Sequence, residues 1–309
     1  MIKIFKTFGG YVEIPEIEKG CWINITNPTN NEIQRIVEDF KLPEDIVRDI
    51  LDVDERPRLE FDDLWSLIII RIPIQNQANG VPYYTVPLGI FETDNFTLTL
   101  CIQDNEILPL KQQSPFREHY KEITDNLNFI LRLFLRSGNQ YLKFLKQINQ
   151  HTATIEQDLE KSIKNSELNK LLKMEKCLVY FITSIKSNEI VLAKLRNSKK
   201  IITEINEDLL EDAIIENKQA LELAQIYSDI QSGMMDAFAS VISNNLNVVM
   251  KQLTLISIIL MIPTLIASIF GMNVPNHMET SYLALPSIVI FSLLMSFLGV
   301  LIFRKKQWF

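Results

Sequence analysis

The chain has 309 residues, a net charge of −7 and a composition that is 47% hydrophobic and 22% charged. These values exclude a disordered chain, which combines low hydrophobicity with high charge, and a nucleic-acid-binding protein, which needs a surplus of Lys and Arg. Three widely separated cysteines, Cys21, Cys101 and Cys177, exclude a fold built on disulfides and a zinc site of the CxxC type.

Residues 1–115 are predicted to form an α/β domain. Nine of the twelve prolines lie here, and they separate short apolar runs that indicate strands. Two short helices are expected at 30–40 and 43–51, the first entered through an Asn-Pro-Thr-Asn turn that offers cap residues. The expected strands are residues 2–5, 11–14, 21–25, 65–74, 83–91 and 96–102.

Residues 116–250 are predicted to form a region of long helices. No proline occurs between Pro115 and Pro263, and apolar residues recur at spacings of three and four, as in an amphipathic helix. Polar clusters near 164–166 and 197–200 are expected to break the helices. The last helix is expected to begin near 204–208 and to continue without a stop as far as Phe270.

Residues 251–309 are predicted to be a transmembrane domain. This segment has four basic residues and one acidic residue, so it carries +3 and leaves −10 for residues 1–250. A helix needs about 20 mainly apolar residues to cross the hydrocarbon core. Two stretches meet this need, residues 253–270 and 283–303, and a short polar loop, residues 271–282, joins them.

The basic residues predict the orientation of these two spans. Lys251 precedes the first span, Arg304, Lys305 and Lys306 follow the second, and the loop between them has no Lys or Arg. The positive-inside rule therefore predicts a multi-pass protein of the plasma or inner membrane with both termini in the cytoplasm. The predicted fold class is α+β, with an N-terminal cytosolic α/β domain, a long helical funnel and two C-terminal transmembrane helices.

A short motif, Phe270-Gly271-Met272-Asn273, follows the first span directly. At this position the sequence resembles the CorA family of divalent-metal transport proteins, whose signature is an aromatic residue followed by Gly-Met-Asn, the GMN motif. The resemblance covers essentially the whole chain. Further matches are Pro263-Thr264 in the first span, Asn247, Met250 and Lys251 at its inner approach, the segment 54–60, and the basic tail 304–306 followed by Trp308.

The resemblance implies a homopentamer in which the first span lines the pore above a funnel of long helices. Magnesium is the usual substrate of the family, and some members also carry cobalt and nickel. The ion moves down its electrochemical gradient without ATP, so the implied partners are other copies of the chain, divalent metal ions and the lipid bilayer. No cofactor is expected, and Mg²⁺ acts as both substrate and regulator.

A selectivity filter is expected at Gly271, Met272 and Asn273. Mg²⁺ prefers oxygen ligands and gives up its waters reluctantly. A ring of Asn273 amide oxygens, with the Gly271 carbonyl, can hydrogen-bond the hydrated ion, and because these oxygens are neutral the ion can also leave. Gly271 is expected to let the chain turn at the helix end. The alternative is that Gly-Asn only caps the helix.

A stripe of mixed chemistry runs inward from the filter along the first span, at steps of three and four residues that share one helix face. Its polar members can receive a hydrated cation, and its apolar members can form a constriction that closes by dewetting. The alternative is ordinary packing of one helix against another. The stripe residues are Asn247, Met250, Leu253, Ser257, Met261, Thr264 and Ser268.

Two acidic residues are candidates for handling cations outside the pore. Asp236 matches an acidic position at which family members bind regulatory Mg²⁺ between subunits, where a cation would relieve the repulsion of apposed carboxylates. Glu279 is the sole acid of the outer loop and could attract cations. For Asp236 the alternative is a solvated surface charge.

One alternative of the same fold and two alternatives of other classes compete with magnesium transport. A zinc transporter of the same fold usually has Ile in place of the signature methionine, so Met272 argues against it. A membrane-anchored interaction or signalling protein would need neither the stripe nor the GMN motif. An enzyme finds no support, because the sequence has no P-loop, no GxSxG and no HExxH motif.

Overall fold

The computed structural model describes residues 1–8, 12–75, 80–108, 126–162, 165–198, 206–272 and 282–306. The chain divides into two compact units, Met1–Gly233 and Met234–Phe309. One helix, α6, contributes residues to both units.

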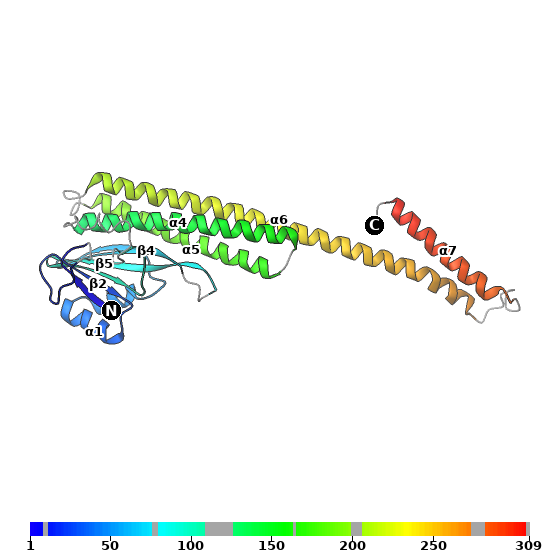
Figure 1. Ribbon diagram of the computed structural model, residues 1–309, viewed down its shortest axis with the longest axis horizontal. Helices are drawn as coiled ribbons and strands as arrows, with labels where there is room; N and C mark the ends of the chain where they lie inside the picture. Colours follow the sequence, from blue (N-terminus) through cyan, green and yellow to red (C-terminus); the bar gives the residue numbers. More distant parts are fainter. Residues whose placement is uncertain are drawn as a thin grey trace. The chain divides into compact units, whose positions relative to one another are not determined.

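The first unit is built on a six-stranded sheet (Figure 1). Strands β2 and β6 pair in parallel, and every other neighbouring pair is antiparallel. The order across the sheet is β1 (Ile2–Phe5), β2 (Cys21–Thr26), β6 (Phe96–Cys101), β5 (Tyr83–Glu92), β4 (Ser66–Gln75) and β3 (Arg58–Phe61).

Two short helices, α1 (Asn30–Phe40) and α2 (Glu44–Ile50), follow β2 as the sequence predicts. The α1 helix begins in a capping box. The Glu32 backbone N–H donates to Thr29 Oγ1 at 3.3 Å, and the Thr29 N–H donates to Glu32 Oε2 at 2.8 Å. The box satisfies two donors that a helix start otherwise leaves unpaired. Hydrogen bonds to Thr29 also lower the pKa of Glu32, since they favour the charged carboxylate.

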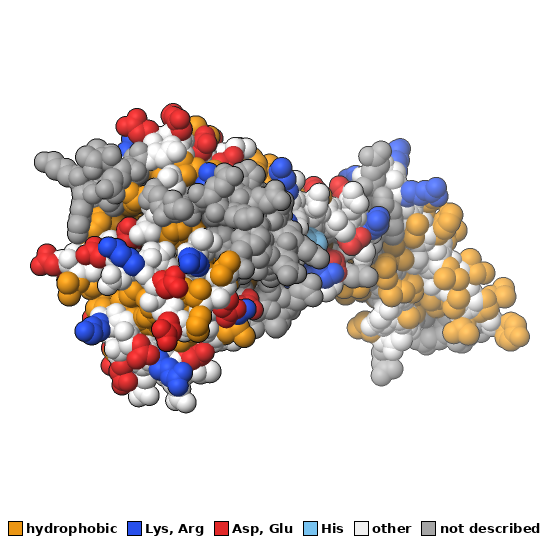
Figure 2. Space-filling model, turned by 60° about the vertical axis from the view of Figure 1, so that its left-hand side comes forward, with side chains coloured by type: hydrophobic (Ala, Val, Ile, Leu, Met, Phe, Trp, Pro, Cys, Tyr) orange, Lys and Arg blue, Asp and Glu red, His pale blue; other side chains and the backbone are white. Residues whose placement is uncertain are grey.

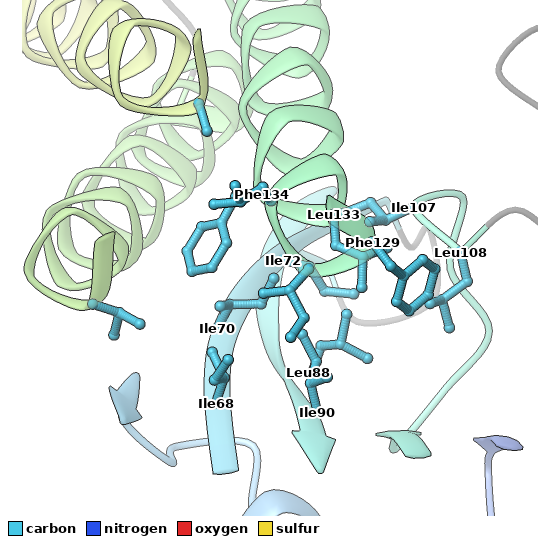
Figure 3. Packing of buried hydrophobic residues seen from close by; sticks show 14 of the residues in the cluster. Ile68, Ile70, Ile72, Leu88, Ile90, Ile107, Leu108, Phe129, Leu133 and Phe134 are labelled. Atoms are coloured by element: carbon cyan, nitrogen blue, oxygen red, sulfur yellow. The ribbon is translucent and has the colours of Figure 1, made fainter. Parts of the chain in front are cut away.

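Both faces of the sheet are buried, which explains the nearly continuous apolar run of β4. Alternate residues of this strand enter different cores. Leu67 and Ile69 pack in the core that contains α1 and α2. The other core is shown in Figure 3, in which Ile68, Ile70 and Ile72 point toward Phe129, Leu133 and Phe134 of α4. The first unit therefore has three layers, with the sheet between two sets of helices.

The helical region consists of α4 (Asn126–Lys161), α5 (Asn165–Asn197) and α6 (Glu207–Phe270), and α7 (Ala284–Lys305) follows in the second unit. As predicted, α4 and α5 are separate helices, α5 ends at Asn197, and one long helix, α6, ends at Phe270; residues 164, 199 and 200 of the predicted breaks lie outside the described residues. Within the first unit, α6 is tied to α5 by two buried amides. Asn217 Nδ2 donates to the Ile185 carbonyl at 3.1 Å, and Gln231 Nε2 donates to the Leu171 carbonyl at 2.6 Å.

Some details differ from the prediction. Strand β3 was not predicted, because its four residues, Arg-Leu-Glu-Phe, have no apolar run and are ordered by pairing with β4. Residues 12–14 form only an isolated bridge, between Glu13 and Phe5, and Tyr11 lies outside the described residues. The first compact unit continues past residue 115 because the sheet shares a core with the long helices.

Beyond the end of β3, a side chain rather than a strand satisfies the backbone hydrogen bonds of β4. Strand β3 pairs with β4 only as far as Ile69, so the backbone of Arg71 lacks a strand partner on that side. Asn188 of α5 takes the strand's place: the Arg71 N–H donates to Asn188 Oδ1, and Asn188 Nδ2 donates to the Arg71 carbonyl, both at 2.8 Å. The buried Tyr141 hydroxyl of α4 donates to the same carbonyl at 2.9 Å. These bonds fix the sheet to both helices.

Replacing Asn188 with Leu is expected to lower the free energy of unfolding by about 1–3 kcal/mol. The substitution keeps the volume but leaves the Arg71 N–H without an acceptor, at ~1–3 kcal/mol for a buried unsatisfied group. The Arg71 carbonyl keeps its bond from Tyr141. Denaturant unfolding of the full-length protein in detergent measures the change. The matched control is Asn139→Leu on α4, an exposed Asn whose side chain donates to the Leu135 carbonyl of its own helix. Equal loss in both variants would contradict the role assigned to Asn188.

Candidate ion-conduction site

The helices α6 and α7 each contain a segment long and apolar enough to cross a membrane. Only 6% of each most apolar window is buried within the chain. Figure 2 shows hydrophobic side chains covering most of the visible surface of this helical pair. Apolar surface on this scale needs a lipid or protein environment.

One face of α6 in the second unit packs against α7. Leu255 is 1% exposed, and Ile259 and Ile262 are partly buried. Two contacts locate α7 on this face. Ser296 Oγ lies 3.5 Å from the Ile259 carbonyl oxygen, and a Cβ added at Gly299 would lie 3.4 Å from Ile262 Cδ1.

The predicted stripe lies on the opposite face of α6. At 100° per residue, its members centre roughly half a turn away from Leu255, Ile259 and Ile262. All seven members are exposed: Asn247, Met250, Leu253, Ser257, Met261, Thr264 and Ser268. Packing within the chain therefore does not account for the stripe, which is available to other copies of the chain or to an aqueous path.

Two hydroxyls of the stripe are oriented by their own helix. Ser257 Oγ donates to the Leu253 carbonyl at 2.9 Å, and Thr264 Oγ1 donates to the Leu260 carbonyl at 3.0 Å. A hydroxyl has one proton and two lone pairs, so donating its proton leaves the lone pairs free to accept. The waters around a divalent cation are hydrogen-bond donors, and these oxygens are therefore suited to receive a hydrated cation.

The GMN motif begins where α6 ends, at Phe270. The Gly271 N–H donates to the Ala267 carbonyl at 2.9 Å, and the Met272 N–H donates to the Ile269 carbonyl at 3.4 Å. Gly271 does not adopt the left-handed conformation of a typical helix cap, but a Cβ there would approach the Ala267 oxygen to 3.2 Å. The last carbonyls of a helix carry partial negative charge, which favours a cation at this end.

Of the other predicted site residues, the structure describes Asp236 but neither Asn273 nor Glu279. Asp236 is exposed on α6, fourteen residues before Met250, and this spacing brings it to the same side of the helix as the stripe. Among the described residues, no group of three or more His, Cys, Asp or Glu side chains could hold a metal ion. Asn273 and Glu279 lie outside the described residues, so their roles rest on the sequence alone.

The sequence-based prediction named no residue of α7 in the site. Ser292, Ser296 and Gly299 are small residues spaced by four and three on one side of this helix, and they mark where α6 approaches. Small residues at such spacing in an apolar segment are a known signal of close helix packing in membranes. The sequence therefore shows the spacing of these small residues, whereas it does not show which residues of α6 they contact.

An α/β unit, a helix that continues from it into an apolar helical pair, and a helix end carrying Gly-Met-Asn together define a membrane transport protein for metal ions. The chain belongs to the family described as CorA-like Mg²⁺ transporter protein, whose model matches residues 18–306. The family consists of membrane transporters rather than enzymes, so the predicted family, fold class and transport function are confirmed.

The similar proteins cover nearly the whole chain. The cobalt/magnesium transport protein CorA of Methanocaldococcus jannaschii is 26% identical over 298 residues, which are 93% of this chain and 90% of the relative. The protein of the same name from Thermotoga maritima is 25% identical over 303 residues, covering 93% and 83%. The complete structure of the M. jannaschii CorA magnesium transporter has a TM-score of 0.83 at 22% identity, covering 100% of this chain and 99% of the other.

Proposed function

We propose that this chain is one subunit of a homopentameric channel that carries Mg²⁺, and also Co²⁺ or Ni²⁺, passively into the cell. The observation that carries the proposal is the exposed stripe on α6, on the face that α7 leaves free. Polar side chains inside a membrane face a bundle interior or a water-filled cavity rather than lipid. Copies of the chain arranged around an axis would turn the stripe toward such a cavity, and the number five rests on the family resemblance.

The chemistry of the stripe suits a hydrated ion. Asn247 and Thr264 offer neutral oxygens, which bind the waters of Mg²⁺ without replacing them. A membrane potential that is negative inside drives a divalent cation inward by about 4.6 kcal/mol per 100 mV, twice the value for one elementary charge. This is enough to favour entry without ATP.

Metal flux into proteoliposomes tests the proposal. Purified protein is reconstituted and uptake of Mg²⁺, Co²⁺, Ni²⁺ and Zn²⁺ is compared under the same inward gradient and inside-negative potential. We expect uptake of Mg²⁺ and Co²⁺ that rises with the potential and needs no nucleotide. Absence of flux for every metal would refute a transporter, and flux of Zn²⁺ alone would favour a zinc carrier of the same fold.

Regulation by internal Mg²⁺ is proposed to involve Asp236. The carboxylate is exposed and is not part of a metal-binding cluster among the described residues of the single chain. A regulatory site at Asp236 would therefore need a second subunit. A bound Mg²⁺ would relieve repulsion between carboxylates brought together around the axis, and so would stabilise the closed state.

Replacing Asp236 with Ala is expected to raise the internal Mg²⁺ concentration that half-inhibits uptake by at least about fivefold, the lower end of typical allosteric coupling. Flux at low internal Mg²⁺ should be retained, because the residue lies outside the stripe. The measurement is uptake into proteoliposomes preloaded with graded Mg²⁺. Asp212→Ala, an exposed acid on another side of α6, is the control and should leave the inhibition unchanged. Unchanged inhibition in Asp236→Ala would place the sensor elsewhere.

A further inference from the structure

The pore-lining helix contains a proline at position 263. In an α-helix, the N–H of a residue donates to the carbonyl four residues earlier, so residue 263 would normally bond to the Ile259 carbonyl. Proline has no N–H, and this carbonyl is left without its backbone donor. In a membrane no water is at hand to replace the bond, and neighbouring side chains are a usual substitute.

A hydroxyl from α7 lies beside the carbonyl that Pro263 frees. Ser296 Oγ is 3.5 Å from the Ile259 oxygen and 3.0 Å from the oxygen of Ser292 in its own helix. The Ser292 carbonyl already receives the backbone N–H of Ser296 through regular α7 geometry. The shorter contact is the one to Ser292, but only at Ile259 would the hydroxyl proton serve a carbonyl that has no backbone donor.

The close approach of the two helices depends on the small side chains of α7. A Cβ at Gly299 would stand 3.4 Å from Ile262 Cδ1, and Ser292 is 7% exposed. A Cβ at Gly299 would reach van der Waals contact with Ile262, so a side chain that extends further in this direction would meet α6. The serine at 296 is thus placed beside the one carbonyl of this helix segment that proline deprives of a donor.

We propose that Ser296 is a positioning residue of the transporter. Its hydroxyl supplies the donor that Pro263 removes and thereby holds α6 against α7 beside the missing backbone hydrogen bond. The outer end of α6, which carries the stripe residues Thr264 and Ser268 and leads into the GMN motif, keeps its place through this contact. The inference deepens the proposed function and rests on it for its effect on flux, whereas the contact itself does not depend on transport.

A double-mutant cycle tests the proposal in the full-length protein. The variants are Ser296→Ala, Pro263→Ala and their combination, with Ser296→Thr as the conservative variant that keeps the hydroxyl. Maximal Mg²⁺ flux in proteoliposomes is one readout, and the denaturant midpoint in detergent is the other. Ser292→Ala is the matched control, because the hydroxyl of Ser292 donates to the Val289 carbonyl of its own helix at 2.8 Å.

Ser296→Ala is expected to lower maximal flux about threefold and to lower the denaturant midpoint, in line with the average strength of an interhelical hydrogen bond in a membrane. In the Pro263→Ala background the restored N–H serves the Ile259 carbonyl, so the same substitution should change neither readout. Ser296→Thr should retain both, and Ser292→Ala should have the same effect in both backgrounds.

Equal effects of Ser296→Ala in both backgrounds would overturn the contact. If the effects of Ser296→Ala and Pro263→Ala on the denaturant midpoint are coupled but Ser296→Ala leaves the flux unchanged, the positioning role is overturned. If the wild-type protein carries no metal at all, the proposed function fails and the positioning role with it, but the cycle in the denaturant midpoint still decides the contact between Ser296 and Ile259.

Discussion

Replacing Asn273 with Ala is expected to abolish Mg²⁺ uptake while leaving the oligomer intact. The amide oxygen is proposed to accept hydrogen bonds from the waters of the bound ion. Each such bond contributes about 0.5–1.5 kcal/mol, so losing one from every subunit of a ring of five would reduce flux at least about a hundredfold. Uptake of Mg²⁺ into proteoliposomes measures the loss, and size-exclusion chromatography in detergent reports the oligomer.

The control for this variant is Asn276→Ala, which removes the same amide from the same loop outside the motif. It should retain most of the uptake. Flux at the wild-type level in Asn273→Ala would remove Asn273 from the filter. Loss of flux in both variants, with intact oligomers, would indicate that the loop as a whole rather than the motif sets permeation.

The parts of the fold that depend on local composition were predictable from the sequence. The absence of proline between Pro115 and Pro263 and of charge between Lys251 and Glu279 predicted that one helix would continue to Phe270, and α6 does so. Strand β3 was not predictable, because its residues are extended only through their partner strand. The hydrogen bonds of Asn188 to the edge of β4 were not predictable either, since they join residues that are 117 positions apart in the chain.

In the candidate site, too, features that depend on local periodicity were predictable and features that depend on packing were not. Helical spacing placed the seven stripe residues on one face, because that depends on periodicity alone. Which face of α6 the second helix covers depends on packing, and it required the positions of Leu255 and Gly299. The donor for the carbonyl freed by Pro263 lies 37 residues away on α7, so the proline was visible in the sequence and its compensation was not.

Replacing Leu253 with Ser is expected to let the channel conduct at internal Mg²⁺ concentrations that close the wild-type protein. Leu253 is 58% exposed in the single chain and belongs to the stripe, between Met250 and Ser257. A ring of leucines can close a pore by excluding water, without any contact that occludes it. Each leucine accounts for about 1.5–3 kcal/mol of unfavourable hydration, so a ring of serines would keep the constriction wet.

The measurement is uptake at high internal Mg²⁺, which should rise at least about tenfold above the residual wild-type level. This is the change expected if the free energy of wetting the constriction falls by the contribution of a single leucine, about 1.5 kcal/mol. Ile256→Ser is the matched control, because Ile256 is 49% exposed and lies on another side of α6, away from both the stripe and α7. It should leave closure intact. Closure at wild-type Mg²⁺ concentrations in Leu253→Ser would show that the gate is not hydrophobic at this level.

Since Asp236→Ala would also weaken closure, the two variants are distinguished by added internal Mg²⁺. Excess ion should still close a channel with a weakened sensor, whereas a hydrated constriction should conduct at every concentration.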